Sequence, residues 1–117
     1  MRIRSDIFVS ALTRRVFNDG GYAAVVIKGS DAAGAIFVLQ RFRDGLETLY
    51  GPAPQAFIQA EDRDDRLFEA RLARVEAEAV EALIAREAKF DSDLWLVEIE
   101  VERIGDYLEL AAPSPSL

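Results

Sequence analysis

The stretch G-A-I-F-V-L-Q-R-F-R-D-G-L-E-T-L-Y-G-P-A-P, from Gly34 to Pro54, decides the fold of this chain. Ala35–Phe42 predicts a strand that begins with apolar residues on both faces. Asp44-Gly45 predicts a tight turn, because both residues tolerate the positive φ that such a turn demands. Leu46–Tyr50 then predicts the partner strand. Since neither face of Ala35–Leu39 suits water, we expect this segment to lie either between two helices or between a helix and a second copy of the chain.

Further strands are predicted before and after this hairpin in the sequence. Tyr22–Lys28 is apolar and β-branched, and with the hairpin it gives three strands in antiparallel meander order. Leu94–Arg103 alternates with period two, which is typical of a strand with one buried and one wet face. Gly51-Pro52-Ala53-Pro54 predicts a break in the sheet, since neither proline can donate a backbone hydrogen bond. Shorter strands are predicted at Ala56–Gln59, Leu67–Leu72 and Tyr107–Leu110, and Leu67–Leu72 also fits a helix.

Two amphipathic helices complete the pattern, one from about residue 5 to 19 and one from about 74 to 90. We expect Ser5 to cap the first helix and Gly20 to end it in a left-handed conformation. Phe90 is expected to point inward at the end of the second. These patterns predict an α+β fold, with an antiparallel meander sheet of about four to six strands. Residues 1–110 are expected to form a single domain and residues 111–117 a flexible tail.

The composition limits the chemistry. The 117 residues include no cysteine and no histidine. The chain therefore has no disulfide, no thiolate nucleophile and no Cys-ligated metal, and it lacks the commonest general base. We predict no catalytic residue, no metal site and no cofactor, and we favour a binding protein over an enzyme.

The charge is acidic and unevenly distributed. The net charge is −7; residues 1–60 carry seven basic and five acidic residues, and residues 61–117 carry seven basic and sixteen acidic ones. An acidic total argues against nucleic acid as a partner, because nucleic-acid binding needs a positive surface. No apolar run is long enough to span a membrane, and the first residues do not resemble a signal peptide. We therefore expect a cytoplasmic protein without membrane contact.

One candidate ligand site follows from polar and aromatic residues at the predicted ends of helices and strands, where binding residues commonly lie. The site would lie between the Tyr50–Pro52 corner and the Asp91–Trp95 turn, with an arginine of the first helix as an anion clamp. For each residue, ordinary surface or packing roles remain the simpler interpretation. The candidate ligand-binding residues are Arg14, Arg15, Tyr50, Asp91, Asp93 and Trp95.

Four motifs carry a resemblance to a known family. They are R-x-R-S-D-I-F-V-S-A-L-T-R-R at Arg2–Arg15, G-A-I-F-V at Gly34–Val38, L-Y-G-P-A-P-Q at Leu49–Gln55 and F-D-S-D-L-W-L-V-E-I-E at Phe90–Glu100. In this order they resemble domain-of-unknown-function family 1491, a group of small bacterial proteins. The resemblance implies a compact α+β domain from a bacterial cytoplasm. It implies no activity, ligand or catalytic residue.

Two interpretations of function remain open. The first is a non-enzymatic binding or interaction module that associates with itself as a homodimer, motivated by the two apolar faces of Ala35–Leu39. The alternative is a small ligand-binding protein, or an enzyme that works without histidine and cysteine, with its site at the Tyr50–Pro52 corner and the Asp91–Trp95 turn.

Overall fold

The computed structural model describes residues 3–54 and 66–111. The two long helices are α1, Ser5–Asn18, and α2, Ala77–Phe90. The strands are β1 Tyr22–Ile27, β2 Ile36–Arg41, β3 Glu47–Pro52, β4 Leu67–Val75, β5 Trp95–Glu100 and β6 Glu109–Leu110, and a 3-10 helix, η2, covers Ile104–Asp106. The predicted α+β class is therefore confirmed. No helix in the described ranges is both long and apolar enough to cross a membrane.

The six strands form one mixed sheet in the order β1-β5-β2-β3-β4-β6. The predicted antiparallel meander is wrong in this respect: β1 does not pair with β2, because β5 lies between them, antiparallel to β1 and parallel to β2. The physical reason is burial. Trp95 and Val97 face one side of the sheet and Leu96 the other, and all three are buried. The first half of β5 has no wet face, so it takes a central position.

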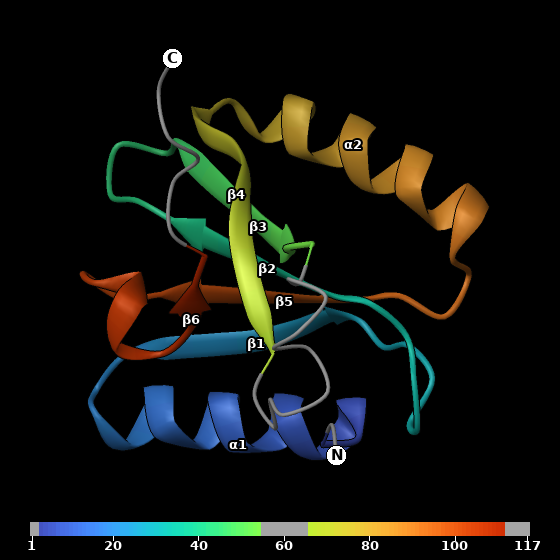
Figure 1. Cartoon of the computed structure of the whole chain (residues 1–117). Coiled ribbons are helices and arrows are strands. Elements are labelled where there is room, and N and C mark those ends of the chain that lie inside the picture. Colours follow the sequence, from blue (N-terminus) through green and yellow to red (C-terminus); the bar gives the residue numbers. More distant parts are fainter. Residues whose placement is uncertain (1–2, 55–65, 112–117) are drawn as a thin grey trace.

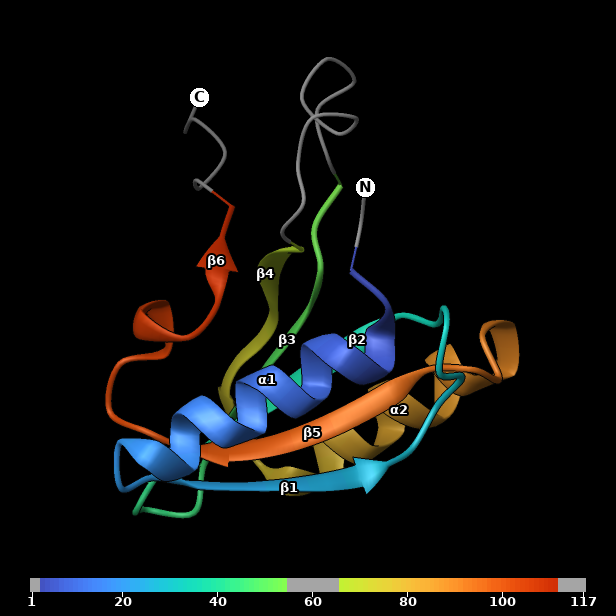
Figure 2. The ribbon, with the colours of Figure 1, turned by 90° about the horizontal axis from the view of Figure 1, so that it is seen from below.

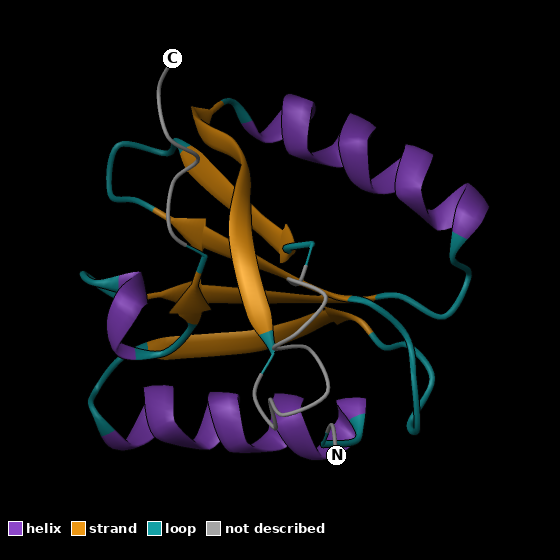
Figure 3. Ribbon diagram, viewed as in Figure 1, coloured by secondary structure: helices purple, strands orange, loops and turns teal. Residues whose placement is uncertain are grey.

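The two helices cover opposite faces of the sheet (Figures 1 and 3). Between α1 and the sheet lies a core that includes Ile36 and Val38 of β2. Between α2 and the sheet lies a second core that includes Phe37 and Leu39. The expectation that Ala35–Leu39 is covered on both sides is confirmed, with a helix on each side. A second copy of the chain is not needed to cover β2, so the original reason to expect a homodimer is gone.

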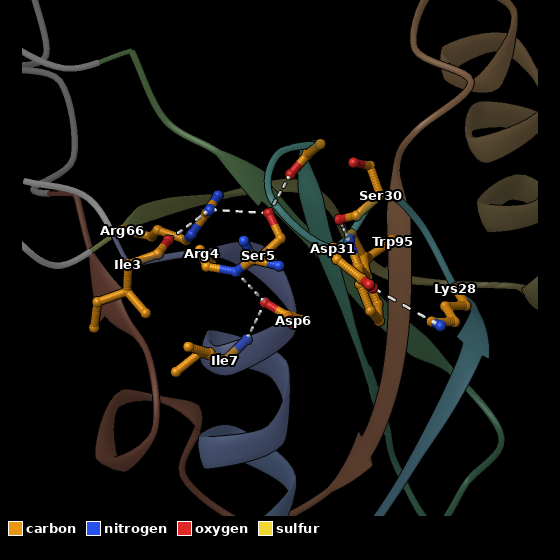
Figure 4. Close-up of polar contacts among 11 residues, drawn as sticks. Ile3, Arg4, Ser5, Asp6, Ile7, Lys28, Ser30, Asp31, Arg66 and Trp95 are labelled. Atoms are coloured by element: carbon orange, nitrogen blue, oxygen red, sulfur yellow. Dashed lines mark hydrogen bonds and ion pairs between the residues drawn. The ribbon is translucent and has the colours of Figure 1, made fainter.

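Helix α1 begins differently from the prediction. Arg4, not Ser5, occupies the N-cap position. The buried Ser5 hydroxyl donates to the Gly34 carbonyl at 3.0 Å and accepts from Arg66 Nη2 at 3.0 Å (Figure 4). Ser5 therefore ties the helix to the loop before β2 and to the start of β4. The other end of the helix follows the prediction: Gly20 has a φ of +86°.

The break predicted at Gly51-Pro52-Ala53-Pro54 begins only after Pro52. Gly51 and Pro52 still belong to β3 and lie opposite Glu69 and Phe68 of β4. Gly51 is required there by packing, because a Cβ at this position would lie 2.7 Å from the Phe37 ring. Pro52 is the last residue of the strand.

The remaining boundaries shift modestly. Residues 67–72 form a strand, as favoured, but β4 continues to Val75 and α2 begins only at Ala77. Phe90, expected inward, is 85% exposed. The predicted strand at Tyr107–Leu110 shrinks to the two residues of β6. The predicted strand at Ala56–Gln59 lies outside the described residues, as do residues 112–117 of the predicted tail.

Candidate functional site

Among the described residues, the outer edge of β1 forms an exposed apolar surface. This strand is the last one on its side of the sheet, and Figure 2 shows it along one margin with α1 in front of the neighbouring β5. Four of its six side chains are large, apolar and exposed: Tyr22, Val25, Val26 and Ile27, with Val26 the most exposed at 53%. In the described ranges no further strand pairs with this edge. Its outward backbone N–H and C=O groups are therefore available to another strand.

The apolar surface continues from β1 onto α1. The exposed Phe17 ring lies edge-on to the Tyr22 ring, with centroids 6.3 Å apart. An exposed aromatic pair next to an exposed strand extends the apolar area that water must cover. We call Phe17, Tyr22, Val25, Val26 and Ile27 together the β1 edge surface.

No charge interrupts this edge. The sequence from Gly20 to Ile27 has no acidic or basic residue, although the chain as a whole carries a net charge of −7. Asp19 precedes this run and Lys28 follows it; Lys28 Nζ lies 3.8 Å from an Asp31 carboxylate oxygen, and both side chains are exposed (Figure 4). The one irregularity is a bulge between Val25 and Ile27, where the pairing with β5 shifts by a residue.

Three of the sequence-predicted site residues lie together, but in structural roles. Asp91 follows α2; its Oδ2 accepts from the Ala35 N–H at 3.1 Å and its Oδ1 accepts from the Asp93 N–H at 2.9 Å. The Asp93 carbonyl accepts from the Ser30 N–H at 3.1 Å. Trp95 is buried, and its Nε1 donates to the Ser30 carbonyl at 2.9 Å (Figure 4). These contacts fasten the loop before β2 to the start of β5.

The Tyr50–Pro52 corner lies at the same end of the sheet, because β3 runs antiparallel to β2. Phe37 and Arg71 occupy the space beside the corner: Arg71 Nη2 donates to the Pro52 carbonyl at 2.6 Å, and its guanidinium lies 5.6 Å from the Phe37 ring centroid. Tyr50 packs against the core below α1, and burial raises the pKa of its hydroxyl. The corner is thus a packed junction.

Arg14 and Arg15 lie at the opposite end. Both belong to the last turns of α1, and Arg15 Nη2 donates to the Asp106 carbonyl at 2.9 Å. Asp106 follows the carboxyl end of β5, whereas Asp93 precedes its amino end. The length of β5, about 20 Å, therefore separates the two groups. The structure does not bring the six predicted residues into one site, and no group of three or more acidic side chains in the described ranges is placed to hold a metal.

The sequence prediction missed the β1 edge surface for a specific reason. The meander placed Tyr22–Lys28 beside Ala35–Phe42 and did not say whether another strand pairs with its other side. The uncharged run itself was visible in the sequence, but such a run fits a central strand as well as an edge strand. The strand order distinguishes the two positions: β1 is the last strand on its side of the sheet, and β5 is its one neighbour there.

Comparisons with known proteins agree with the fold. A solution structure of a protein from A. tumefaciens is 59% identical, with a TM-score of 0.85 over 99% of this chain and 100% of that one. A crystal structure of a DUF1491 family protein from Caulobacter crescentus CB15 is 30% identical, with a TM-score of 0.74 over 96% of this chain and 100% of that one. No protein of curated function matches. The model of the family described as "Protein of unknown function (DUF1491)" matches residues 3–109. The resemblance noted in the sequence is thereby confirmed: this chain belongs to the DUF1491 family.

Proposed function

We propose that this protein is a non-enzymatic interaction module whose β1 edges pair antiparallel, so that two copies form a homodimer with one continuous sheet. The observation that carries the proposal is the exposed, uncharged and apolar β1 edge surface. An open apolar edge strand is a template for another strand. A protein that keeps such an edge without charges commonly uses it for strand addition.

The second copy is the partner that fits the charges. A homodimer needs a self-complementary surface. Although each chain carries −7, pairing of two uncharged strands brings no like charges into direct contact. Antiparallel pairing also brings the Lys28 end of one strand near the Asp19 end of the other. Opposite charges then meet at both ends of the interface, which favours antiparallel over parallel association.

The apolar side chains add a second contribution. Pairing would cover Tyr22, Val25, Val26 and Ile27, each at least 36% exposed in the single chain. Burying apolar area contributes about 25 cal/mol for each Å² removed from water. Aromatic and β-branched side chains are also the residues that pair most favourably between neighbouring strands.

The test is the mass in solution of two single variants. By size-exclusion chromatography with light scattering, we expect the unmodified chain at micromolar concentration to have twice the 13.0 kDa mass of one chain. Val26→Lys places a charge on the edge, where it opposes strand pairing, and should give a monomer. Phe90→Lys alters an equally apolar, even more exposed side chain at the end of α2 and should leave the dimer intact.

The outcomes separate the partners. A monomeric unmodified chain would contradict self-association and would leave the edge to a strand of another protein. A dimer that persists in Val26→Lys but is lost in Phe90→Lys would place the interface elsewhere.

The predicted cytoplasmic location and the absence of nucleic-acid binding belong to the same proposal. Cell fractionation checks the first, and a mobility-shift assay at low salt checks the second.

A further inference from the structure

A groove lies at the end of the sheet where its central parallel strands finish. Strands β2 and β5 are parallel neighbours, so their carboxyl ends meet at one edge. Here the chain leaves β2 for the β2–β3 hairpin and leaves β5 for η2, and a groove of about 840 Å³ opens between these segments and the turn before β1. In open α/β sheets, ligands commonly bind beyond the carboxyl ends of parallel strands, and β2 and β5 form such a parallel pair here.

Several charged groups of the groove already have partners. Arg103 Nε lies 3.2 Å from Asp106 Oδ2, and the Tyr107 hydroxyl donates to Asp19 Oδ2 at 2.8 Å. Arg41 Nη2 lies 3.1 Å from Glu47 Oε2 and 3.0 Å from Glu98 Oε1. These contacts hold three walls of the groove in place: the turn before β1, the end of β2 and the segment that follows β5.

Three charged side chains of the lining remain without such a partner. Within the described residues, Glu100, Glu102 and Arg43 form no ion pair and no side-chain hydrogen bond, and all three are exposed. Glu100 also lies within electrostatic range of Arg41 of the same groove. Glu100 is the last residue of β5 and Glu102 follows it, whereas Arg43 belongs to the β2–β3 hairpin. The groove therefore offers two anionic groups and, from a separate segment, one cationic group.

This arrangement has a complementary ligand. Carboxylates form their strongest hydrogen bonds with ammonium and guanidinium groups, and a guanidinium binds a carboxylate through two parallel hydrogen bonds. A molecule with two cationic groups and one carboxylate would match all three side chains. We propose that the groove binds a small zwitterion of the basic amino-acid type, with Arg43 on its carboxylate and Glu100 and Glu102 on its cationic groups.

The test is an NMR titration of the isotope-labelled chain with L-arginine at low ionic strength. We expect saturable shifts in Gly20, Gly21 and residues 41–43 and 100–103. Glu100→Gln and Glu102→Gln should each weaken binding about tenfold, because each removes one charge-assisted hydrogen bond. The matched controls Glu81→Gln and Arg86→Gln, on exposed positions of α2, should leave the affinity unchanged.

A second ligand tests the role of Arg43. Agmatine keeps the guanidinium and the amine of arginine but lacks the carboxylate. It should bind about tenfold more weakly than L-arginine to the unmodified chain, and the two ligands should bind Arg43→Gln equally. Shifts that do not saturate, that spread over α2, or that persist unchanged in Glu100→Gln and Glu102→Gln would overturn the proposal. Equal affinity of the unmodified chain for agmatine and L-arginine would overturn it as well. The amide spectrum of each variant shows whether it is folded.

Discussion

The two edges of the sheet are built in opposite ways. On one side, β1 presents six uncharged residues, most of them apolar and exposed. On the other side, β4 carries Glu69, Arg71 and Arg74, and the two-residue β6 pairs only with Leu67 and Phe68. The arginines of β4 bind neighbouring parts of the chain: Arg71 contacts the Pro52 carbonyl, and Arg74 forms an ion pair with Asp44 and lies 4.4 Å from the Phe42 ring centroid.

This difference indicates which edge is better suited to pair with another strand. Charged residues and very short edge strands are the ordinary means by which a sheet avoids pairing with another chain. The β4 side has both, whereas β1 has only the bulge near Val26. If the chain pairs with itself through a strand, the β1 edge is the one suited to do so, while the β4 edge stabilises the fold of a single chain.

The largest expected difference between the edges is in the free energy of unfolding. Phe68 of β4 is 1% exposed and packs against the Phe8 ring, with centroids 5.8 Å apart. Phe68→Ala should therefore lower the free energy of unfolding by about 3–5 kcal/mol. In urea titrations of the dilute, monomeric chain, Val25→Ala on β1 should lower it by less than about 0.5 kcal/mol. Equal losses would show that β1 is as well packed as β4 and would remove the contrast.

A smaller effect is expected at Arg71, which joins β3, β4 and α2. Its Nη2 donates to the Pro52 carbonyl, its Nε lies 3.1 Å from Glu69 Oε2 and its Nη1 lies 3.4 Å from Glu87 Oε1. Arg71→Gln should lower the free energy of unfolding by about 1–3 kcal/mol, because it removes hydrogen bonds to a charged group. Arg86→Gln, on the exposed side of α2, is the matched control and should change it by less than about 0.5 kcal/mol.

The smallest effect concerns the contact that links the segment before β6 to the turn before β1. The Tyr107 hydroxyl donates a hydrogen bond to Asp19. This bond raises the pKa of Tyr107 above its ordinary value of 10.0, and burial acts in the same direction. A raised pKa means that this contact stabilises the fold below pH 10 and is lost as the pH rises through the pKa of the folded state.

A spectrophotometric titration of the tyrosines checks this contact. Asp19→Asn should return the pKa of Tyr107 toward its ordinary value, so that one tyrosine titrates at lower pH than in the unmodified chain. The control Glu81→Gln, on α2, should leave the titration unchanged. A titration that is the same in Asp19→Asn and the unmodified chain would show that the contact does not form in solution.

The local patterns of the sequence predicted most of the elements, because helix period, strand alternation and turn residues act within a few positions. Gly20 and Asp44-Gly45 were predicted on that basis, and the Gly20 and Gly45 φ angles of +86° and +89° agree. The order of the strands was not predictable in this way. The insertion of β5 between β1 and β2 depends on contacts between residues about 70 positions apart, such as Val25 opposite Val97.

The candidate site was harder to predict than the fold. Asp91, Asp93 and Trp95 were correctly placed at element ends, but polar groups at such ends also satisfy backbone N–H and C=O groups, and Asp91 and Trp95 do so here. The β1 edge surface exists because no described strand pairs with the outer side of β1. The groove is formed by segments that are distant in sequence. Neither property is present in any single stretch of residues.

The most direct test of the central claim is an NMR experiment on an equal mixture of isotope-labelled and unlabelled chains, filtered for contacts between copies. Pairing through the β1 edge predicts intermolecular nuclear Overhauser effects among the protons of Tyr22–Ile27, in an antiparallel pattern that joins the two ends of the strand. Intermolecular contacts confined to α2 or to the β4 side, or a monomer without any such contacts, would contradict it.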